Sequence, residues 1–167
     1  MSVDDIKASA DAARQAIQNA LAAAHAARAE AQQLAQDAAA RGWEGVARTV
    51  MAAQSALEVV ASSLGSAHDA TDGAAGGAAE ITTQLAPKDI AARAAGVIAQ
   101  HDQAVSGIGA ASGSVRQAYQ YAQQVEANRL IAVVAAVADS LGTARQAVVA
   151  AKSTAEAERQ EAGAWGK

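Results

Sequence analysis

The side chains that could carry out chemistry are few in this chain of 167 residues, and they lie far apart in the sequence. None of the three histidines, His25, His68 and His101, has a histidine or a glutamate four residues away, the spacing that places two metal ligands on one helix face. The chain has no cysteine, so it has no thiolate nucleophile. No grouping of serine, aspartate and histidine singles out a catalytic triad. We therefore expect no catalytic site, no metal and no cofactor.

The segment Ser106–Ser114 contains three glycines, Gly107, Gly109 and Gly113, and resembles a phosphate-binding loop in composition. Its spacing differs from that of G-x-G-x-x-G, and no strand precedes it. Apolar residues also continue through it at helical spacing. We interpret it as the surface of an alanine- and glycine-rich helix.

The elements that would position any site are indicated by apolar residues at alternating steps of three and four. Four such series follow one another, from Val3 through Leu34 to Ala38, from Val46 to Leu85, from Ile90 to Val125, and from Leu130 to Ala162. A period of 3.5 residues is typical of helices that pack along a seam. The series predict helices over about 3–40, 43–85, 88–126 and 129–163, an antiparallel four-helix bundle of two hairpins, 3–85 and 88–163, in a single domain.

Two places in this pattern allow alternatives. Three glycines, Gly73, Gly76 and Gly77, interrupt the second series with residues that weaken helices, but the series passes through them in phase. We expect the helix to continue there instead of forming a loop. Between Val125 and Leu130 the step is five, which predicts a tight turn, although a skip within one continuous helix would leave the same pattern.

Composition and charge narrow the class of protein. Hydrophobic residues make up 51% of the chain and aromatic residues only 2%, which favours helices packed at close range. A net charge of -4 argues against nucleic acid as the partner.

The N-terminus has no signal peptide, and no uncharged run reaches the roughly 20 residues of a membrane-spanning helix. We expect a chain without a transmembrane segment, cytoplasmic or secreted without a cleaved signal peptide. Charged residues, with Arg116 and Arg145 among them, are expected on solvated faces.

Three polar residues occupy seam positions. Thr71, His101 and Glu158 are the polar exceptions in the second, third and fourth series, and counting from the turns places them at similar heights. They predict a buried layer of hydrogen-bonded polar side chains that fixes the register of the helices. A metal or ligand site is the alternative.

The predicted tip of the first hairpin contains Trp43, Glu44 and Gly45, a W-x-G motif between two long helices. This resembles the WxG family, small helical hairpins exported by type VII (ESX) secretion systems of actinobacteria and firmicutes. The resemblance covers residues 1–86. It implies a hairpin with the motif at its tip, export without a cleaved signal peptide, and pairing into four-helix bundles. The family's export signal, a tyrosine followed four residues later by an acid, is missing, since Tyr119 is followed by Gln123 and Tyr121 by Val125.

These observations favour a non-enzymatic helical interaction protein, either a WxG-like type VII substrate or a partner of one, with self-association as a further expectation. The rival class is a cytoplasmic coat or scaffold, since alanine- and glutamine-rich amphipathic helices also resemble the phasins that cover polyester granules. A small-ligand-binding bundle is a third class, and it depends on His101 alone.

Overall fold

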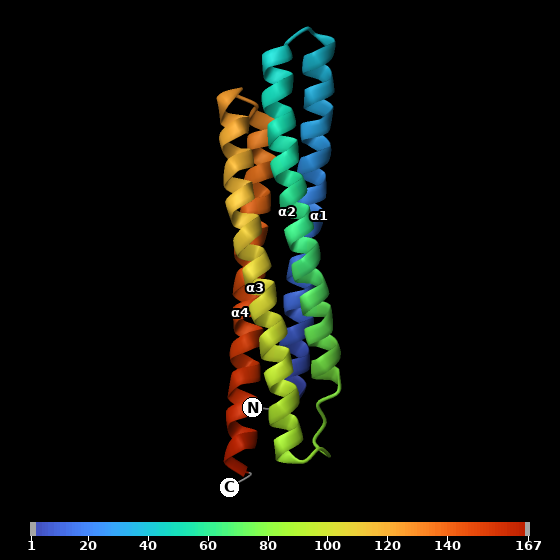
Figure 1. Cartoon of the computed structure of the whole chain (residues 1–167), viewed down its shortest axis with the longest axis vertical. Helices are drawn as coiled ribbons and strands as arrows, with labels where there is room; N and C mark the ends of the chain where they lie inside the picture. Colours follow the sequence, from blue (N-terminus) through green and yellow to red (C-terminus); the bar gives the residue numbers. More distant parts are fainter. Residues whose placement is uncertain (1–2, 166–167) are drawn as a thin grey trace.

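The structure, a computed structural model, describes residues 3–165. It contains α1 (Val3–Ala40), α2 (Glu44–Ala79), α3 (Pro87–Gln124) and α4 (Asn128–Trp165), and these residues contain no strand. Each helix packs on two neighbours, α1 and α3 on both α2 and α4 (Figure 1). The fold is the antiparallel four-helix bundle predicted from the sequence.

The core consists of the predicted seams, and most of its members are alanine or valine. Every residue of the fourth series, from Leu130 to Ala162, is buried. Four positions were wrong: Leu34, Val46, Leu85 and Val125 are only half-buried, and Ala35 takes the place of Leu34 in the core. Leu34 instead lines a hollow beside the turn of the second hairpin, with Ala127 and Asn128 on the other side.

The second helix is shorter than predicted. It continues through Gly73 and Gly77 but ends at Ala79, and residues 80–86 form an irregular link to Pro87, the first residue of α3. Ile81 lies in this link yet is fully buried. The link therefore also places an apolar side chain in the core. This is why the apolar spacing in the sequence continues past the end of the helix and predicted a longer helix.

Both hairpin turns close through the same backbone hydrogen bonds. Trp43 and Ala127 each donate to the carbonyl five residues earlier, at 2.9 and 3.0 Å, and Gly42 and Glu126 each donate to the carbonyl three residues earlier. This is the Schellman pattern, which requires a left-handed residue after the helix. Gly42 adopts it with φ 74°, and Glu126 adopts it with φ 51° despite its side chain.

Glycines allow the two hairpins to approach closely along α2 and α3. A Cβ atom on Gly107 would lie 2.9 Å from the Ser63 carbonyl oxygen, and one on Gly73 would lie 2.7 Å from Nε2 of Gln100. Gly107 therefore has a packing role against the backbone of α2, whereas a Cβ atom on Gly76 would meet nothing within 4 Å.

The second hairpin repeats the first. α1 and α3 each contain 38 residues, and each turn inserts three residues between helices. Pro87 and Asn128 begin α3 and α4 84 residues after Val3 and Glu44 begin α1 and α2. Because 84 residues are twelve whole heptads, a buried position in one hairpin corresponds to a buried position in the other.

The two hairpins are staggered along the bundle axis. The turn between α1 and α2 lies beyond the turn between α3 and α4, and both chain ends lie toward the opposite end (Figure 1). The α3–α4 turn contacts α1 at the level of Glu30, where Nε of Arg129 lies 3.2 Å from the Glu30 carboxylate. The last turn of α1 and the first turn of α2 therefore project past the second hairpin.

Candidate functional site

Two polar side chains of the core, one on α2 and one on α3, lie at the same height in the bundle. Thr71 and His101 are both fully buried. They are at the same height, because Gln100, the residue before His101, lies against Gly73, two residues after Thr71. Together they separate an apolar cluster nearer the α1–α2 turn from a second cluster nearer the chain ends.

The hydrogen-bonded layer predicted from the sequence is not formed. The Thr71 hydroxyl donates within its own helix, to the carbonyls of Ala67 and His68 at 3.2 and 2.9 Å. Neither Nδ1 nor Nε2 of His101 has a hydrogen-bond partner. Burial lowers the pKa of His101 from its ordinary value, and the carboxylate of Asp102 opposes that shift. The imidazole is therefore held in its neutral form.

Glu158 lies at another height. Nζ of Lys152 is 2.6 Å from the Asp102 carboxylate, which places Lys152 near the height of His101. Glu158 is six residues further along α4, about 9 Å at the helical rise. It is 8% exposed, and burial followed by the negative charge of Glu161 raises its pKa. Thr71, His101 and Glu158 therefore do not form a single layer.

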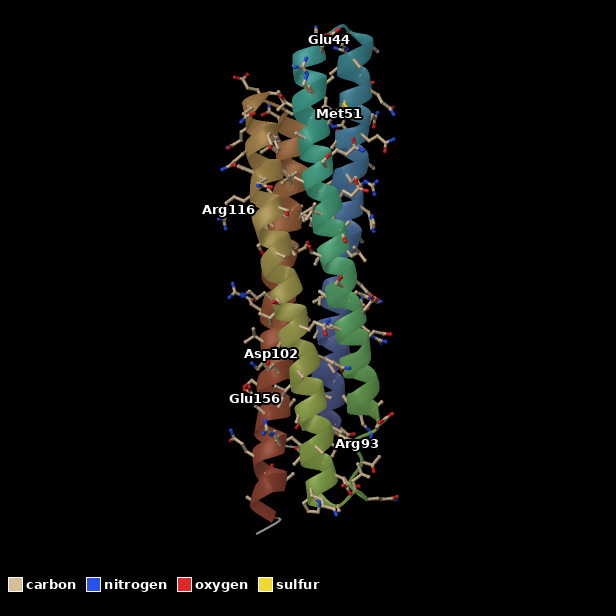
Figure 2. All side chains as sticks on the ribbon, viewed as in Figure 1. Glu44, Met51, Arg93, Asp102, Arg116 and Glu156 are labelled. Carbon is tan, nitrogen blue, oxygen red and sulfur yellow. The ribbon has the colours of Figure 1, made fainter. Side chains whose placement is uncertain are left out.

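No metal centre is present among residues 3–165, because no three His, Cys, Asp or Glu side chains gather there. His68 lies 3.0 Å from Gln18 on α1, and its ring takes part in no acidic cluster. Most charged side chains lie on the outside of the bundle, as Glu44 and Asp102 do in Figure 2.

The W-x-G motif lies on the projecting end of the first hairpin. We call residues 41–45 the tip. Trp43 precedes the first residue of α2, its side chain is 54% exposed, and the Arg41 guanidinium lies 5.2 Å from its ring centroid. Gly45 is in the first turn of α2, and a Cβ atom there would meet nothing within 4 Å. Neither packing nor backbone conformation within this chain requires glycine at that position.

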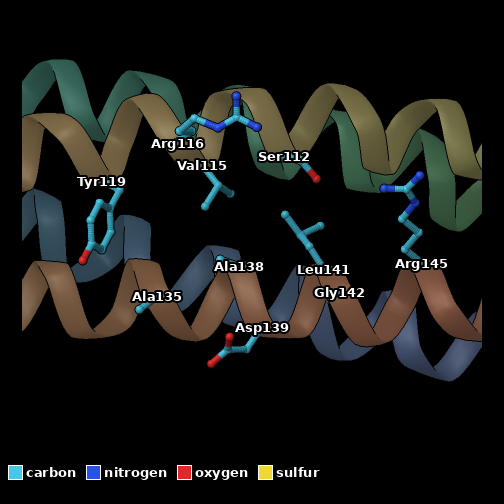
Figure 3. Close-up of a pocket in the computed structure, with 10 residues that line it drawn as sticks. All are labelled: Ser112, Val115, Arg116, Tyr119, Ala135, Ala138, Asp139, Leu141, Gly142 and Arg145. Carbon is cyan, nitrogen blue, oxygen red and sulfur yellow. The ribbon is translucent and has the colours of Figure 1, made fainter.

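Sequence reasoning missed a groove between α3 and α4 of about 450 Å³. Val115 and Leu141 lie in it, Arg145 reaches across it from α4, and Arg116 lies along α3 at its edge (Figure 3). These arginines fall off the seams, so the sequence pattern assigned them to solvated faces. The sequence signal for this groove is the lack of bulky residues on the side of α4 that faces α3. That signal can be recognised only once the packing of the helices is known.

By length and composition alone, α4 could cross a membrane, with a window of mean hydropathy 1.2 within Asn128–Ala164, of which 28% is buried in the bundle. In the structure this helix packs against α1 and α3. The expectation of a chain without a transmembrane segment stays a prediction.

No known protein family, curated protein or solved structure matches this chain. Its function must therefore be argued from its own surfaces.

Proposed function

We propose that this chain is a non-enzymatic helical interaction protein that binds a protein partner through the tip of its first hairpin. The observation that carries the proposal is the exposure of Trp43, 54% of whose side chain is accessible on a tip that projects beyond the second hairpin. A rigid aromatic ring offers a large contact area at low entropic cost, which is why tryptophan is frequent at binding hot spots.

Two features of the tip support this role. The Arg41 guanidinium stacks over the Trp43 ring, so a cation and an aromatic ring form one surface. Gly45 leaves the first turn of α2 without a side chain, and the space that a Cβ atom would occupy is empty. A partner could approach the backbone there, which supports a recognition role for the whole W-x-G motif. The resemblance to the WxG family leads us to propose a type VII secretion system as the source of the partner.

A coat protein that spreads over an apolar surface would need a continuous apolar face. Among residues 3–164, the large apolar side chains with high exposure are Trp43, Met51, Val59 and Val149, and they are divided between the tip, α2 and α4. This distribution favours a local contact over a coat, so we do not propose the phasin-like alternative.

The test is quantitative affinity purification from the native host with the intact chain and with Trp43→Ala. We expect at least one protein to be lost by tenfold or more with the variant, a change typical of a hot-spot residue. The variant should remain folded, because Trp43 is half exposed and its truncation should cost less than the roughly 3–5 kcal/mol of a fully buried aromatic.

Met51→Ala is the matched control, since Met51 is also large, apolar and exposed (57%) but lies outside the tip. It should leave capture unchanged. Gly45→Ala should raise helix stability, by up to about 1 kcal/mol, yet weaken capture if the partner reaches the backbone. Retention of every captured protein by Trp43→Ala, or losses that only follow its unfolded fraction, would refute the proposal.

A further inference from the structure

The α3–α4 groove is a second surface with features of a binding site, far from the tip. Val115 and Leu141, both nearly buried, form its floor. Tyr119 stands at one end and spans the space between the helices, and Arg145 reaches across from α4 at the other end (Figure 3). The volume of about 450 Å³ is within the range of small-molecule sites in proteins.

The internal repeat shows how this groove differs from the same place in the first hairpin, where α1 and α2 form a hollow of about 380 Å³ only nearer the chain ends. At the corresponding place in the first hairpin, Arg28 on α1 lies 3.3 Å from Glu58 on α2, and this ion pair covers the space between the helices. Eighty-four residues later the two positions are Ser112 and Gly142. The second hairpin therefore lacks the ion pair that bridges the helices of the first hairpin at this place.

The charges on the groove also differ between the hairpins. Arg116 and Arg145 replace Gln32 and Ala61 of the first hairpin. Neither arginine has an ion-pair partner among residues 3–165. Asp139 is the one carboxylate that lines the groove, and it points away from the space between the helices (Figure 3). Two cations thus flank an apolar floor in a chain whose net charge is -4.

We propose that the α3–α4 groove binds a small organic anion, a molecule with an aromatic body and one phosphate or carboxylate group. The guanidinium group of Arg145, which reaches across the groove, donates to the oxyanion, for which its planar donor geometry is suited, and Arg116 adds positive charge on the other side of the floor. The body lies on Val115 and Leu141, with the ring of Tyr119 against its far end. The limited volume of the groove favours a small molecule over a protein segment.

The test uses 1-naphthyl phosphate as the probe, titrated into the full isotope-labelled chain and followed by amide NMR. We expect saturable shifts confined to 112–119 and 135–145. The neutral body alone, 1-naphthol, and inorganic phosphate alone should each bind at least tenfold more weakly. Arg145→Gln should weaken binding at least fivefold, Arg116→Gln should weaken it less, and Arg28→Gln, on the first hairpin, should leave it unchanged.

A double variant tests the shape of the groove while both arginines remain. Ser112→Arg with Gly142→Glu recreates the ion pair that covers the first hairpin, so it should abolish binding in a chain that remains fully helical. Unchanged affinity in this variant, shifts centred on the tip or on the ends of the helices, or no saturation at millimolar probe would each overturn the proposal.

Discussion

Replacement of His101 by leucine should make the protein more stable. The neutral imidazole carries one hydrogen-bond donor and one acceptor, and in the structure neither nitrogen has a partner although the residue is fully buried. An unsatisfied buried polar group costs about 1–3 kcal/mol. Leucine is similar in volume and has no polar atom to leave unpaired. Ile17, which occupies the corresponding position of the first hairpin, shows that the fold accepts a branched apolar side chain there.

We expect His101→Leu to raise the free energy of unfolding by about 2 kcal/mol near pH 8. For a chain of this size, that corresponds to a rise in melting temperature of about 4–8 °C. The assay is urea denaturation followed by far-ultraviolet circular dichroism, at several pH values, with the wild-type chain measured beside the variant.

The pH dependence gives the same experiment a second readout. Burial lowers the pKa of folded His101 below its unfolded value of 6.5, so below pH 6.5 the unfolded chain binds a proton that the folded chain does not. The wild-type chain should therefore lose stability as the pH falls from 6.5 through the folded pKa, by up to about 1.4 kcal/mol per unit. The stability difference between variant and wild type should grow over that window, which separates His101 from Asp102, Lys152 and other groups common to both chains.

A loss of more than about 1 kcal/mol in His101→Leu near pH 8 would refute this reasoning, because it would show that the imidazole is satisfied in solution. A stability difference that does not change between pH 8 and about pH 5 would contradict the assignment of a lowered pKa.

Further predictions concern three features of the fold. Gly107→Ala should lower the melting temperature, because its Cβ atom would meet a carbonyl oxygen of α2 at 2.9 Å, whereas Gly109→Ala, with nothing within 4 Å, should raise stability by up to about 1 kcal/mol. Glu126→Gly should stabilise the second turn by about 1 kcal/mol because φ is 51° there, and Gly42→Ala should destabilise the first turn by a similar amount. Equal effects of opposite sign on the free energy of unfolding, measured by denaturant titration, would confirm that the two turns share one backbone pattern. Glu158→Gln should stabilise the chain at neutral pH, where the buried carboxylate with its raised pKa is costly, and the gain should vanish at acid pH as the wild-type carboxyl becomes protonated in both states.

The fold could be predicted from the sequence because the heptad pattern specifies which side of each helix is buried. Thr71, His101 and Glu158 were placed in the core by this pattern alone, and they are buried. The end of α2 could not be predicted, since Ile81 is buried from an irregular link as it would be from a helix. The left-handed conformation of Glu126 also could not be predicted from the sequence, because glutamate rarely adopts it.

The heptad pattern could not predict the relative heights of the buried polar side chains. Counting residues from the turns gave similar heights for His101 and Glu158, but small offsets accumulate over 38-residue helices and separate them by more than a helical turn. The α3–α4 groove could not be predicted for the same reason. A groove depends on which bulky side chains two facing helices lack at the same height, and the pattern does not give that height. Arg116 and Arg145 appear as ordinary surface charges until the facing helix is known.

The bundle also holds its two ends at a fixed separation. The tip is at one end, and the link over residues 80–86 and both ends of the described chain are toward the other, separated by helices of 38 residues that span about 57 Å. A fluorophore or a fused domain attached near Val3 would be held at about that distance from Trp43, and one attached near the end of α4 would lie further away because the second hairpin is displaced from the tip. Energy transfer from such a label to an acceptor on a bound partner would therefore report which end of the rod the partner occupies.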